Sequence, residues 1–566
     1  MIKIYPVPKY SEVHNKTLPA DDFGLLTAYP TDLIVLRLSK ITSILYNETD
    51  PAESQRQVFQ QCFPLLNSDR KEKIVRELSK QDENGEVIFF TAPSVLKLIN
   101  QSFKRFQANP EQETLFNTQQ FEDDLFDSIL IQNELYYSSI SSTSNLENYE
   151  DIWQLQLLQQ HYIRDKSALL EIAALKNLLF YKYVTKCTTN GEQYIREFCE
   201  CLGIEGYFNY YFFFIDILNT VWESYKNKDA RHVLNVESGQ KKILRHFSFR
   251  PRDLEKGKYE GNIHKELMSK PFYYVLDESP VIIDFHFFEH VVDLALTYNF
   301  YRLTSLYKSV KYPDFTAFKS DLGKLYYEDF IMKQILENIF RKKNYSFKTP
   351  NRSSPNVDFI IVRNQREVLL IEVKTAEIHF NPLESLNIEE LKIFIKDNFI
   401  SKKDSSLAKN KGVYQLIEQL KDIDNNGSFK FKEQSINKKL TIFPVVVYLE
   451  KVMDMAGVNN YINDIFCAEV AALKTSFKMV YPVTAINMSF FIKYYSALKK
   501  KPSTINELIS SYHKHIISAR KKYQQRPNPF TFLKQNISFD QFTNNNLEKM
   551  DLSGNLKEIT TDLELP

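Results

Sequence analysis

Two apolar segments joined by a short polar turn constrain this chain more than any other feature. Residues 357–363 read Val-Asp-Phe-Ile-Ile-Val-Arg, and residues 368–375 read Val-Leu-Leu-Ile-Glu-Val-Lys-Thr. Short runs rich in Val and Ile that flank polar turn residues are typical of two neighbouring strands. The sequence therefore predicts a β-hairpin, and with it a sheet, in the C-terminal half.

The second strand of this hairpin ends with charged side chains. Because side chains alternate between the two faces of a strand, Glu372 and Lys374 share a face with Leu370, and Val373 lies on the other. Asp358 lies at the start of the first strand, so the hairpin returns it beside Glu372. The charged groups therefore lie at the end of an apolar stripe.

The length of the turn decides whether the two carboxylates meet. A three-residue loop, Asn364–Arg366, pairs Arg363 with Glu367 and puts Asp358 directly opposite Glu372. A two-residue turn would shift the register by one and send Asp358 to the other face. We therefore expect an odd-length loop or a bulge.

Two carboxylates and one ammonium at a sheet edge are costly for folding alone and are typical of a divalent-metal site. The oxygens of Asp358 and Glu372 suit Mg²⁺, with Mn²⁺ as a substitute, and such ions share phosphate oxygens of a substrate. A bound cation lowers the pKa of a water, and Lys374 is placed to orient that water or to stabilise negative charge at phosphorus. The reaction this predicts is phosphodiester hydrolysis.

The spacing Asp-x13-Glu-x-Lys resembles the PD-(D/E)XK nuclease superfamily, whose members have a restriction-endonuclease-like fold. By this resemblance, Asp358, Glu372 and the carbonyl of Val373 hold the metal, and Lys374 serves the attacking water. The superfamily mostly cuts DNA, so the resemblance implies DNA rather than RNA. A restriction-like or antiviral defence effector is the role it implies.

Two helices beside the hairpin extend the resemblance. Residues 323–330 resemble the family's first helix, whose glutamate faces the site, and the matching residue is Glu328. Residues 414–420 resemble the helix after the catalytic strand, which often carries a glutamine. Gln415 is the first candidate for that glutamine and Gln419 the second.

The resemblance spans Asp321–Arg526 and departs from the family in two places. Pro355 stands three residues before Asp358 instead of directly before it. A long segment, Ala376–Lys411, separates the catalytic strand from the glutamine helix, which indicates an insertion. Its lysines would form one wall of a nucleic-acid channel: Lys392, Lys396, Lys402, Lys403, Lys409 and Lys411.

The remainder of the chain is organised around helices. Apolar residues recur at helical spacing through residues 1–250, which predicts an all-α region for recognition or partner binding. A bridging segment, 251–320, precedes an α/β nuclease domain, 321–530, with a mixed central sheet flanked by helices. A polar, acidic tail, 531–566, is expected to be loosely held. The predicted class is therefore α+β and multi-domain.

Composition excludes several classes of protein. Lys and Arg (72) balance Asp and Glu (71), so any nucleic-acid surface must be local. Five cysteines exclude a disulfide framework, and the first residues lack the apolar core of a signal peptide. The most apolar run, Tyr207–Trp222, is interrupted by Asn209 and Asp216, which predicts a buried helix instead of a membrane span. We expect a cytoplasmic protein that binds no membrane, and the sequence leaves a homo-oligomer open.

Residues 226–258 are rich in Lys and Arg, with Phe247, Phe249 and Tyr259 among the charges. This stretch reads either as a phosphate-contacting element or as a solvated linker.

Several histidines have a functional and an ordinary interpretation. His513 and His515 lie in a basic helix, where they would contact phosphate or line a solvated face. His286, Glu289 and His290 have metal-like helical spacing, but phenylalanines surround the two histidines, which favours core-edge positions.

Three functions remain open at this point. The first is an active nuclease, in which Asp358, Glu372 and Lys374 are essential. The second is a catalytically silent nuclease-fold subunit that binds nucleic acid or a protein partner in a larger complex. The third is a helical scaffold whose hairpin carries exposed charges by chance, which would place Asp358 and Glu372 on opposite faces.

Overall fold

The computed structural model describes most of the chain. Its described residues are 7–48, 50–79, 87–108, 117–141, 169–226, 233–236, 238–256, 259–276, 278–293, 295–350, 357–376, 387–402, 410–425, 429–431, 434–436, 439–449, 453–473, 475–547 and 552–565. The protein is mostly helical (64%), with an all-helical N-terminal region and a C-terminal mixed sheet of six strands among helices. Within the described residues, the helices are too short or too polar to cross a membrane.

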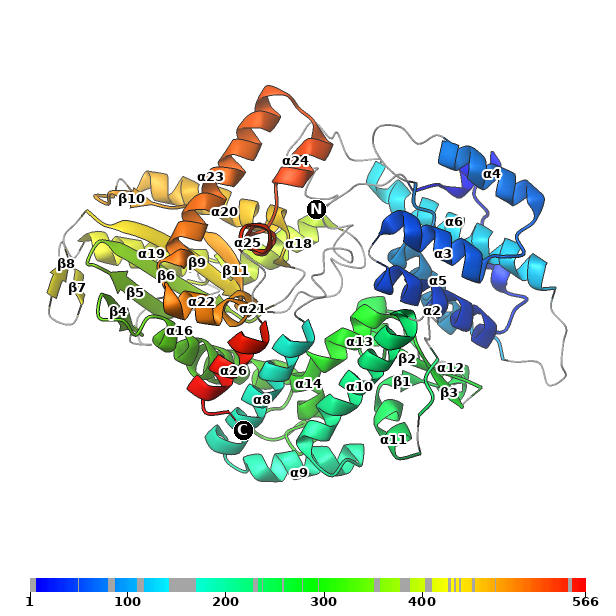
Figure 1. Cartoon of the computed structure of the whole chain (residues 1–566), viewed down its shortest axis with the longest axis horizontal. Coiled ribbons are helices and arrows are strands. Elements are labelled where there is room, and N and C mark those ends of the chain that lie inside the picture. The colour runs from blue at the N-terminus through cyan, green and yellow to red at the C-terminus, as the bar shows by residue number, and fades with distance from the viewer. Residues whose placement is uncertain are drawn as a thin grey trace. The chain divides into compact units, whose positions relative to one another are not determined.

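The chain divides into two compact units (Figure 1). The helical unit consists of Lys3–Ser144 and Glu192–Tyr307, and the sheet unit contains Asn145–Gly191 and Lys308–Pro566. These boundaries differ from the predicted segments in two ways. Helix α8 (Leu169–Cys187) belongs to the sheet unit, and residues 251–307 belong to the helical unit.

The helical unit begins its helices where the sequence provides caps. The Asp50 carboxylate accepts backbone N–H groups in the first turn of α3, and the Thr91 side chain does the same in the first turn of α5. At α4 the cap is Asn67, whose side chain accepts the N–H of Arg70 at 2.9 Å, and Ser68 is already helical. The helical elements of this unit are α1 (Tyr10–His14), η1 (Gly24–Leu26), α2 (Thr31–Asn47), α3 (Pro51–Cys62), α4 (Ser68–Ser79), α5 (Ala92–Lys104), α6 (Thr118–Ser141), α9 (Gly191–Leu202), α10 (Tyr207–Lys226), α11 (Ser238–His246), α12 (Pro251–Glu255), η3 (Ile263–Leu267), α13 (Phe285–Val292) and α14 (Ala295–Arg302).

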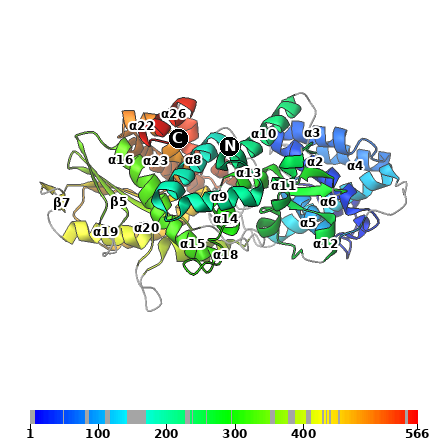
Figure 2. The ribbon, with the colours of Figure 1, turned by 90° about the horizontal axis from the view of Figure 1, so that it is seen from below.

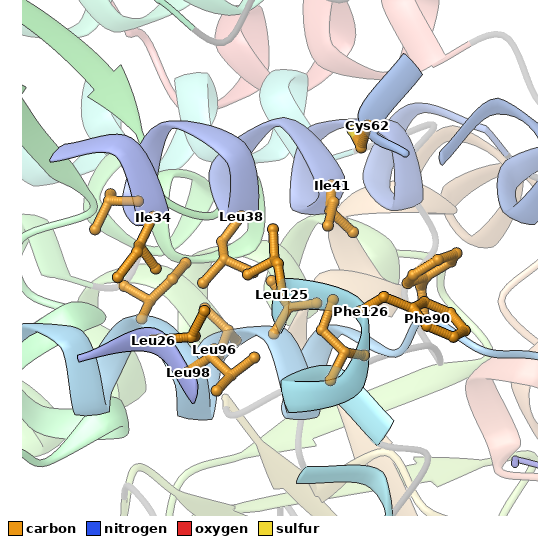
Figure 3. Packing of buried hydrophobic residues seen from close by; sticks show 14 of the residues in the cluster. Leu26, Ile34, Leu38, Ile41, Cys62, Phe90, Leu96, Leu98, Leu125 and Phe126 are labelled. Atoms are coloured by element: carbon orange, nitrogen blue, oxygen red, sulfur yellow. The ribbon is translucent and has the colours of Figure 1, made fainter. Parts of the chain in front are cut away.

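The core of the helical unit lies where α2, α5 and α6 meet (Figure 3). Leu38 of α2, Leu96 of α5 and Leu125 of α6 are fully or almost fully buried there, together with Phe90 and Phe126. Phe90 also stacks on Phe63 with ring centroids 5.2 Å apart. Aromatic rings therefore pack among leucines in this core.

We expect Leu38→Ala to lower the free energy of unfolding of the protein by about 2–5 kcal/mol, because the truncation leaves a cavity in a closely packed core. Leu65→Ala is the matched control, since that side chain is 50% exposed. Urea unfolding followed by circular dichroism measures both. Equal losses in the two variants would contradict the position of Leu38 in the core.

A small three-stranded sheet also belongs to the helical unit. Strand β1 (Ser248–Phe249) pairs in parallel with β2 (Phe272–Val275), which forms an antiparallel hairpin with β3 (Ser279–Ile282). Residues 238–256 therefore form ordered structure, and the interpretation of the basic stretch as a solvated linker is wrong for these residues.

The sheet unit is built on six strands in the order β10-β9-β6-β5-β4, with β11 pairing with β9. Strand β6 lies in the centre, antiparallel to β5 and parallel to β9. Such a central strand is covered on both faces, which explains its nearly continuous apolar run. The strands are β4 (Tyr345–Lys348), β5 (Phe359–Arg363), β6 (Glu367–Lys374), β9 (Thr441–Tyr448), β10 (Met479–Val480) and β11 (Thr484–Asn487), and a separate pair is formed by β7 (Phe429–Phe431) and β8 (Gln434–Ile436).

The hairpin register is the one that the three-residue loop predicts. Arg363 pairs with Glu367 across the hairpin. Asn364 and Gln365 both have left-handed backbone conformations (φ 50° and 56°), and the N–H of Arg366 donates to the carbonyl of Arg363 at 3.0 Å. This is the geometry of a type I′ turn extended by one residue, which fits the twist of a hairpin.

Helices cover both faces of this sheet (Figure 2). Helices α19 and α20 lie on one side, and α16 and α22 on the other. The first face holds a core formed by even-numbered residues of β5 and β6 with α18, α19 and α20. The helical elements here are α8, α15 (Phe315–Asp321), η4 (Leu322–Met332), α16 (Lys333–Ile339), α18 (Ile388–Ile395), η5 (Lys396–Ile400), α19 (Val413–Asn425), α20 (Ala456–Ala472), α21 (Met488–Lys493), α22 (Tyr495–Lys500), α23 (Thr504–Gln525), α24 (Pro529–Gln535), α25 (Phe539–Asn546) and α26 (Leu552–Asp562).

The acidic tail is more ordered than its composition predicts. Helix α26 buries Ile559 fully, and the Asp562 carboxylate accepts the hydroxyl of Tyr495 at 2.7 Å. Lys499 forms an ion pair with Glu558 at 2.8 Å. The acidic residues therefore bind partners on α22, and the expectation of a loosely held tail is wrong for residues 552–565.

Candidate active site

The hairpin brings the predicted carboxylates together at the end of β6. Asp358 immediately precedes β5, and the register that pairs Phe359 with Ile371 continues to Asp358 opposite Glu372. The Oδ2 atom of Asp358 accepts the backbone N–H of Val373 at 2.7 Å. The scaffold interpretation, which required the two carboxylates on opposite faces, is therefore not supported.

Lys374 links this pair to helix α19. Its Nζ donates to the Oε1 atom of Glu372 and, at 3.0 Å, to the Oε1 atom of Gln415. The same Gln415 oxygen accepts the N–H of Gly412 at 2.8 Å. Gln415 is therefore held in place by its own helix start and in turn fixes the Lys374 ammonium.

Two glycines allow the surrounding elements to approach the strand end. A Cβ on Gly323 of η4 would lie 2.6 Å from the Oγ1 atom of Thr375, directly after β6. Gly412, before α19, has φ +55°, and a Cβ there would lie 2.0 Å from the carbonyl oxygen of Phe399. These close contacts give the two glycines a role that sequence reasoning missed, although both lie in segments it singled out.

The element that carries Glu328 has an unusual backbone. Residues Leu322–Met332 form a π-helix, and wider turns of this kind are frequent at functional sites. Glu328 lies within electrostatic range of both Glu372 and Lys374. The structure therefore gathers all five predicted side chains, Glu328, Asp358, Glu372, Lys374 and Gln415, around one strand end.

The site contains more acidic than basic side chains. Burial, followed by the charge of Asp358, raises the pKa of Glu372 well above its ordinary value. Burial alone would lower the pKa of Lys374, but the carboxylates of Glu372 and Asp358 raise it, so the ammonium stays protonated. When fully ionised, three carboxylates face one ammonium, an imbalance equal to the charge of one divalent cation.

The carboxylate oxygens of Asp358 and Glu372 are suitable ligands for a divalent cation. The Oε2 atom of Glu372 is buried, the residue is 1% exposed, and this oxygen has no hydrogen-bond partner among the described residues. A buried carboxylate oxygen without a partner is costly unless a ligand binds it. Among those same residues no group of three or more His, Cys, Asp or Glu side chains is placed to hold a metal. Two carboxylates, supplemented by waters and substrate oxygens, are what Mg²⁺ commonly uses.

Other predicted residues have different outcomes. Gln419 is buried one turn after Gln415, and its Oε1 lacks a hydrogen-bond partner in the described part of the chain. Of the proposed lysine wall, Lys392 forms an ion pair with Glu389 at 2.8 Å, and Lys402 lies over the ring of Tyr414. Lys396 is exposed on η5 and Lys411 is half-buried, whereas Lys403 and Lys409 lie outside the described residues.

Both interpretations of His513 are wrong. The side chain is buried, and its Nε2 lies 2.8 Å from the hydroxyl of Thr484 on β11. His515 bonds the carbonyl of Gln535 at 2.7 Å. His286 lies 3.6 Å from Glu289, at the edge of the core as the ordinary interpretation predicts.

We expect His513 to make the protein less stable in acid. Burial lowers the pKa of His513 from 6.5 to about 3. The unfolded chain therefore binds a proton at this histidine below pH 6.5, whereas the folded chain binds it only near pH 3. The contribution of neutral His513 to the free energy of unfolding is therefore complete above pH 6.5. It decreases as the pH falls toward 3, by up to about 1.4 kcal/mol per pH unit. Urea unfolding of wild type and His513→Gln across this range measures the effect, and parallel profiles would contradict it.

Comparison with known proteins provides no classification. Neither a protein-family model, nor a curated protein, nor a solved structure matches this chain.

Proposed function

We propose that the sheet unit is a Mg²⁺-dependent nuclease of the PD-(D/E)XK kind, which hydrolyses phosphodiester bonds of DNA. The observation that carries this proposal is the pairing of Asp358 with a buried Glu372 whose second carboxylate oxygen has no partner among the described residues. A structural role alone gives no reason to bury two neighbouring carboxylates that share one ammonium and to leave one of their oxygens without a partner among those residues.

The strand arrangement supports a restriction-endonuclease-like fold. Strands β5 and β6 form the antiparallel hairpin, β9 runs parallel to β6, and α19 follows between them. The π-helix η4 precedes the hairpin and carries Glu328 to the same strand end. This order is the one that the resemblance implies.

The roles of the side chains follow from their positions. Asp358, Glu372 and the Val373 carbonyl would hold Mg²⁺, or Mn²⁺ as a substitute. When bound, the cation supplies a water of lowered pKa and a Lewis acid at phosphorus. Lys374, fixed by Gln415, presents a protonated ammonium that orients the water and stabilises negative charge on the phosphorane. Glu328 would add a nearby negative charge that favours the bound cation.

The proposal is tested with purified full-length protein incubated with supercoiled plasmid, linear DNA and RNA of matched length. Cleavage of DNA in Mg²⁺ and its loss in EDTA are the expected results. Cleavage of RNA alone would correct the substrate. Tight metal-independent binding without cleavage of any substrate would instead favour the catalytically silent subunit.

A further inference from the structure

A cluster of basic residues in the helical unit has no role in the site at β6. Residues 238–256, which form α11, β1 and α12, contain six Lys or Arg but only two acidic residues, in a chain whose overall charges balance. Local concentration of positive charge is the electrostatic footprint of a polyanion-binding surface.

The small sheet places these cations beside others from later in the chain. The register that pairs Ser248 with Phe272 continues to His246 beside Lys270 and to Arg250 beside Tyr274. Lys270 and Arg250 are therefore separated along the sheet by four residues, about 13 Å. The Lys270 ammonium lies 5.1 Å from the ring centroid of Phe249. Arg250 directly follows β1, and Lys270 lies two residues before β2.

The cluster contains donors that the protein does not satisfy. The Nε atom of Arg302, at the end of α14, and the hydroxyl of Tyr274 are both buried without a hydrogen-bond partner in the described part of the chain. Tyr274 is itself only 3% exposed. Buried donors without acceptors are rare, and a bound acceptor is a common explanation.

These cations also affect each other unfavourably. Burial, followed by the charge of Arg302, lowers the pKa of His246. Burial also lowers the pKa of Lys270. The charges of Arg302 and Arg250 lower it further, whereas the charge of Asp253 raises it. Arg250 is paired with Asp253 at 2.9 Å, whereas Arg245, Lys270 and Arg302 have no acidic partner within ion-pair distance among the described residues. An anion is what such a cluster lacks.

We propose that Arg245, Lys270 and Arg302 form a phosphate-binding surface that holds the backbone of a nucleic acid. The inference rests on the proposed function only for the choice of polymer. The three cations come from α11, the residues just before β2 and the end of α14, so the surface is assembled from three separate segments of the chain.

The test is a binding measurement that is independent of cleavage. Fluorescence anisotropy of a labelled DNA duplex is measured in EDTA with the full chain carrying Glu372→Gln, at several salt concentrations. We expect binding that weakens with salt. Arg245→Gln with Lys270→Gln should weaken it at least about 10-fold and reduce the slope of log K against log salt by about 1.8.

Two further variants and two competitors make the test decisive. Lys16→Gln with Lys71→Gln removes the same charge from exposed positions outside the cluster and should leave the affinity nearly unchanged. Arg302→Lys keeps the positive charge but removes the planar guanidinium group, which can donate two hydrogen bonds to one phosphate. It should therefore also weaken DNA binding. Equal affinity of the cluster and control variants, binding of phosphatidylserine vesicles or inorganic phosphate in preference to DNA, or no DNA binding at all would each overturn the proposal.

Discussion

Glu372→Gln is expected to lower the rate of DNA cleavage by at least about 1,000-fold, because the neutral amide no longer binds a cation through a charged oxygen. The same change should remove the increase in melting temperature that Mg²⁺ or Mn²⁺ produces in the wild-type protein, since a ligand stabilises only the state that binds it. Without metal, the variant should be about as stable as wild type or more stable. The reason is that burial and Asp358 make the ionised Glu372 unfavourable.

Glu367→Gln is the matched control for this prediction. Glu367 lies on the same strand but pairs with Arg363 at 3.0 Å and with Asn506 at 2.9 Å, away from the site. Cleavage by Glu367→Gln should stay near the wild-type rate. A Glu372→Gln protein that still cleaves, or that is still stabilised by the cations, would contradict the assignment of Glu372 as a ligand.

Lys374→Met is expected to lower the cleavage rate by about 100- to 1,000-fold while metal binding persists. The substitution removes the ammonium that would stabilise charge in the transition state, but it leaves Asp358 and Glu372 intact. It also frees the Oε1 atom of Glu372, to which Lys374 donates in the absence of metal. The stabilisation by Mn²⁺ should therefore be equal to that of wild type or larger.

The contrast between the two variants separates chemistry from binding. Single-turnover cleavage and thermal shift in Mn²⁺ are measured for Lys374→Met and for Lys421→Met, whose side chain on α19 forms an ion pair with Glu418. The control should behave like wild type. Loss of metal stabilisation in Lys374→Met would show that Lys374 supports the fold of the site and has no separate role in the reaction.

The local geometry of the site could be predicted because it depends on short-range rules. Alternation along β6 fixes the shared face of Glu372 and Lys374, and the loop length fixes the register that returns Asp358 to Glu372. Asn364 is a residue that tolerates the left-handed conformation found there. Gln415 was predicted only from the family resemblance, and it contacts Lys374 because α19 begins at Val413, two residues before it.

The rest depends on contacts between distant parts of the chain, which local patterns do not encode. Helix α8 packs with the sheet unit, where the Tyr326 hydroxyl donates to the carbonyl of Lys176, although the intervening residues 192–307 belong to the helical unit. The burial of His513 depends on Thr484 of β11. The order of the tail depends on Lys499 of α22, which neutralises its acidic residues.

The most direct test of the metal site is anomalous diffraction from crystals of the full chain soaked in Mn²⁺. We predict one strong peak at the end of β6, contacting a carboxylate oxygen of Asp358 and the Oε2 atom of Glu372, with the Val373 carbonyl as a further ligand. Saturating Mn²⁺ that leaves these two carboxylates without a peak, or a peak bound by other side chains, would contradict the account.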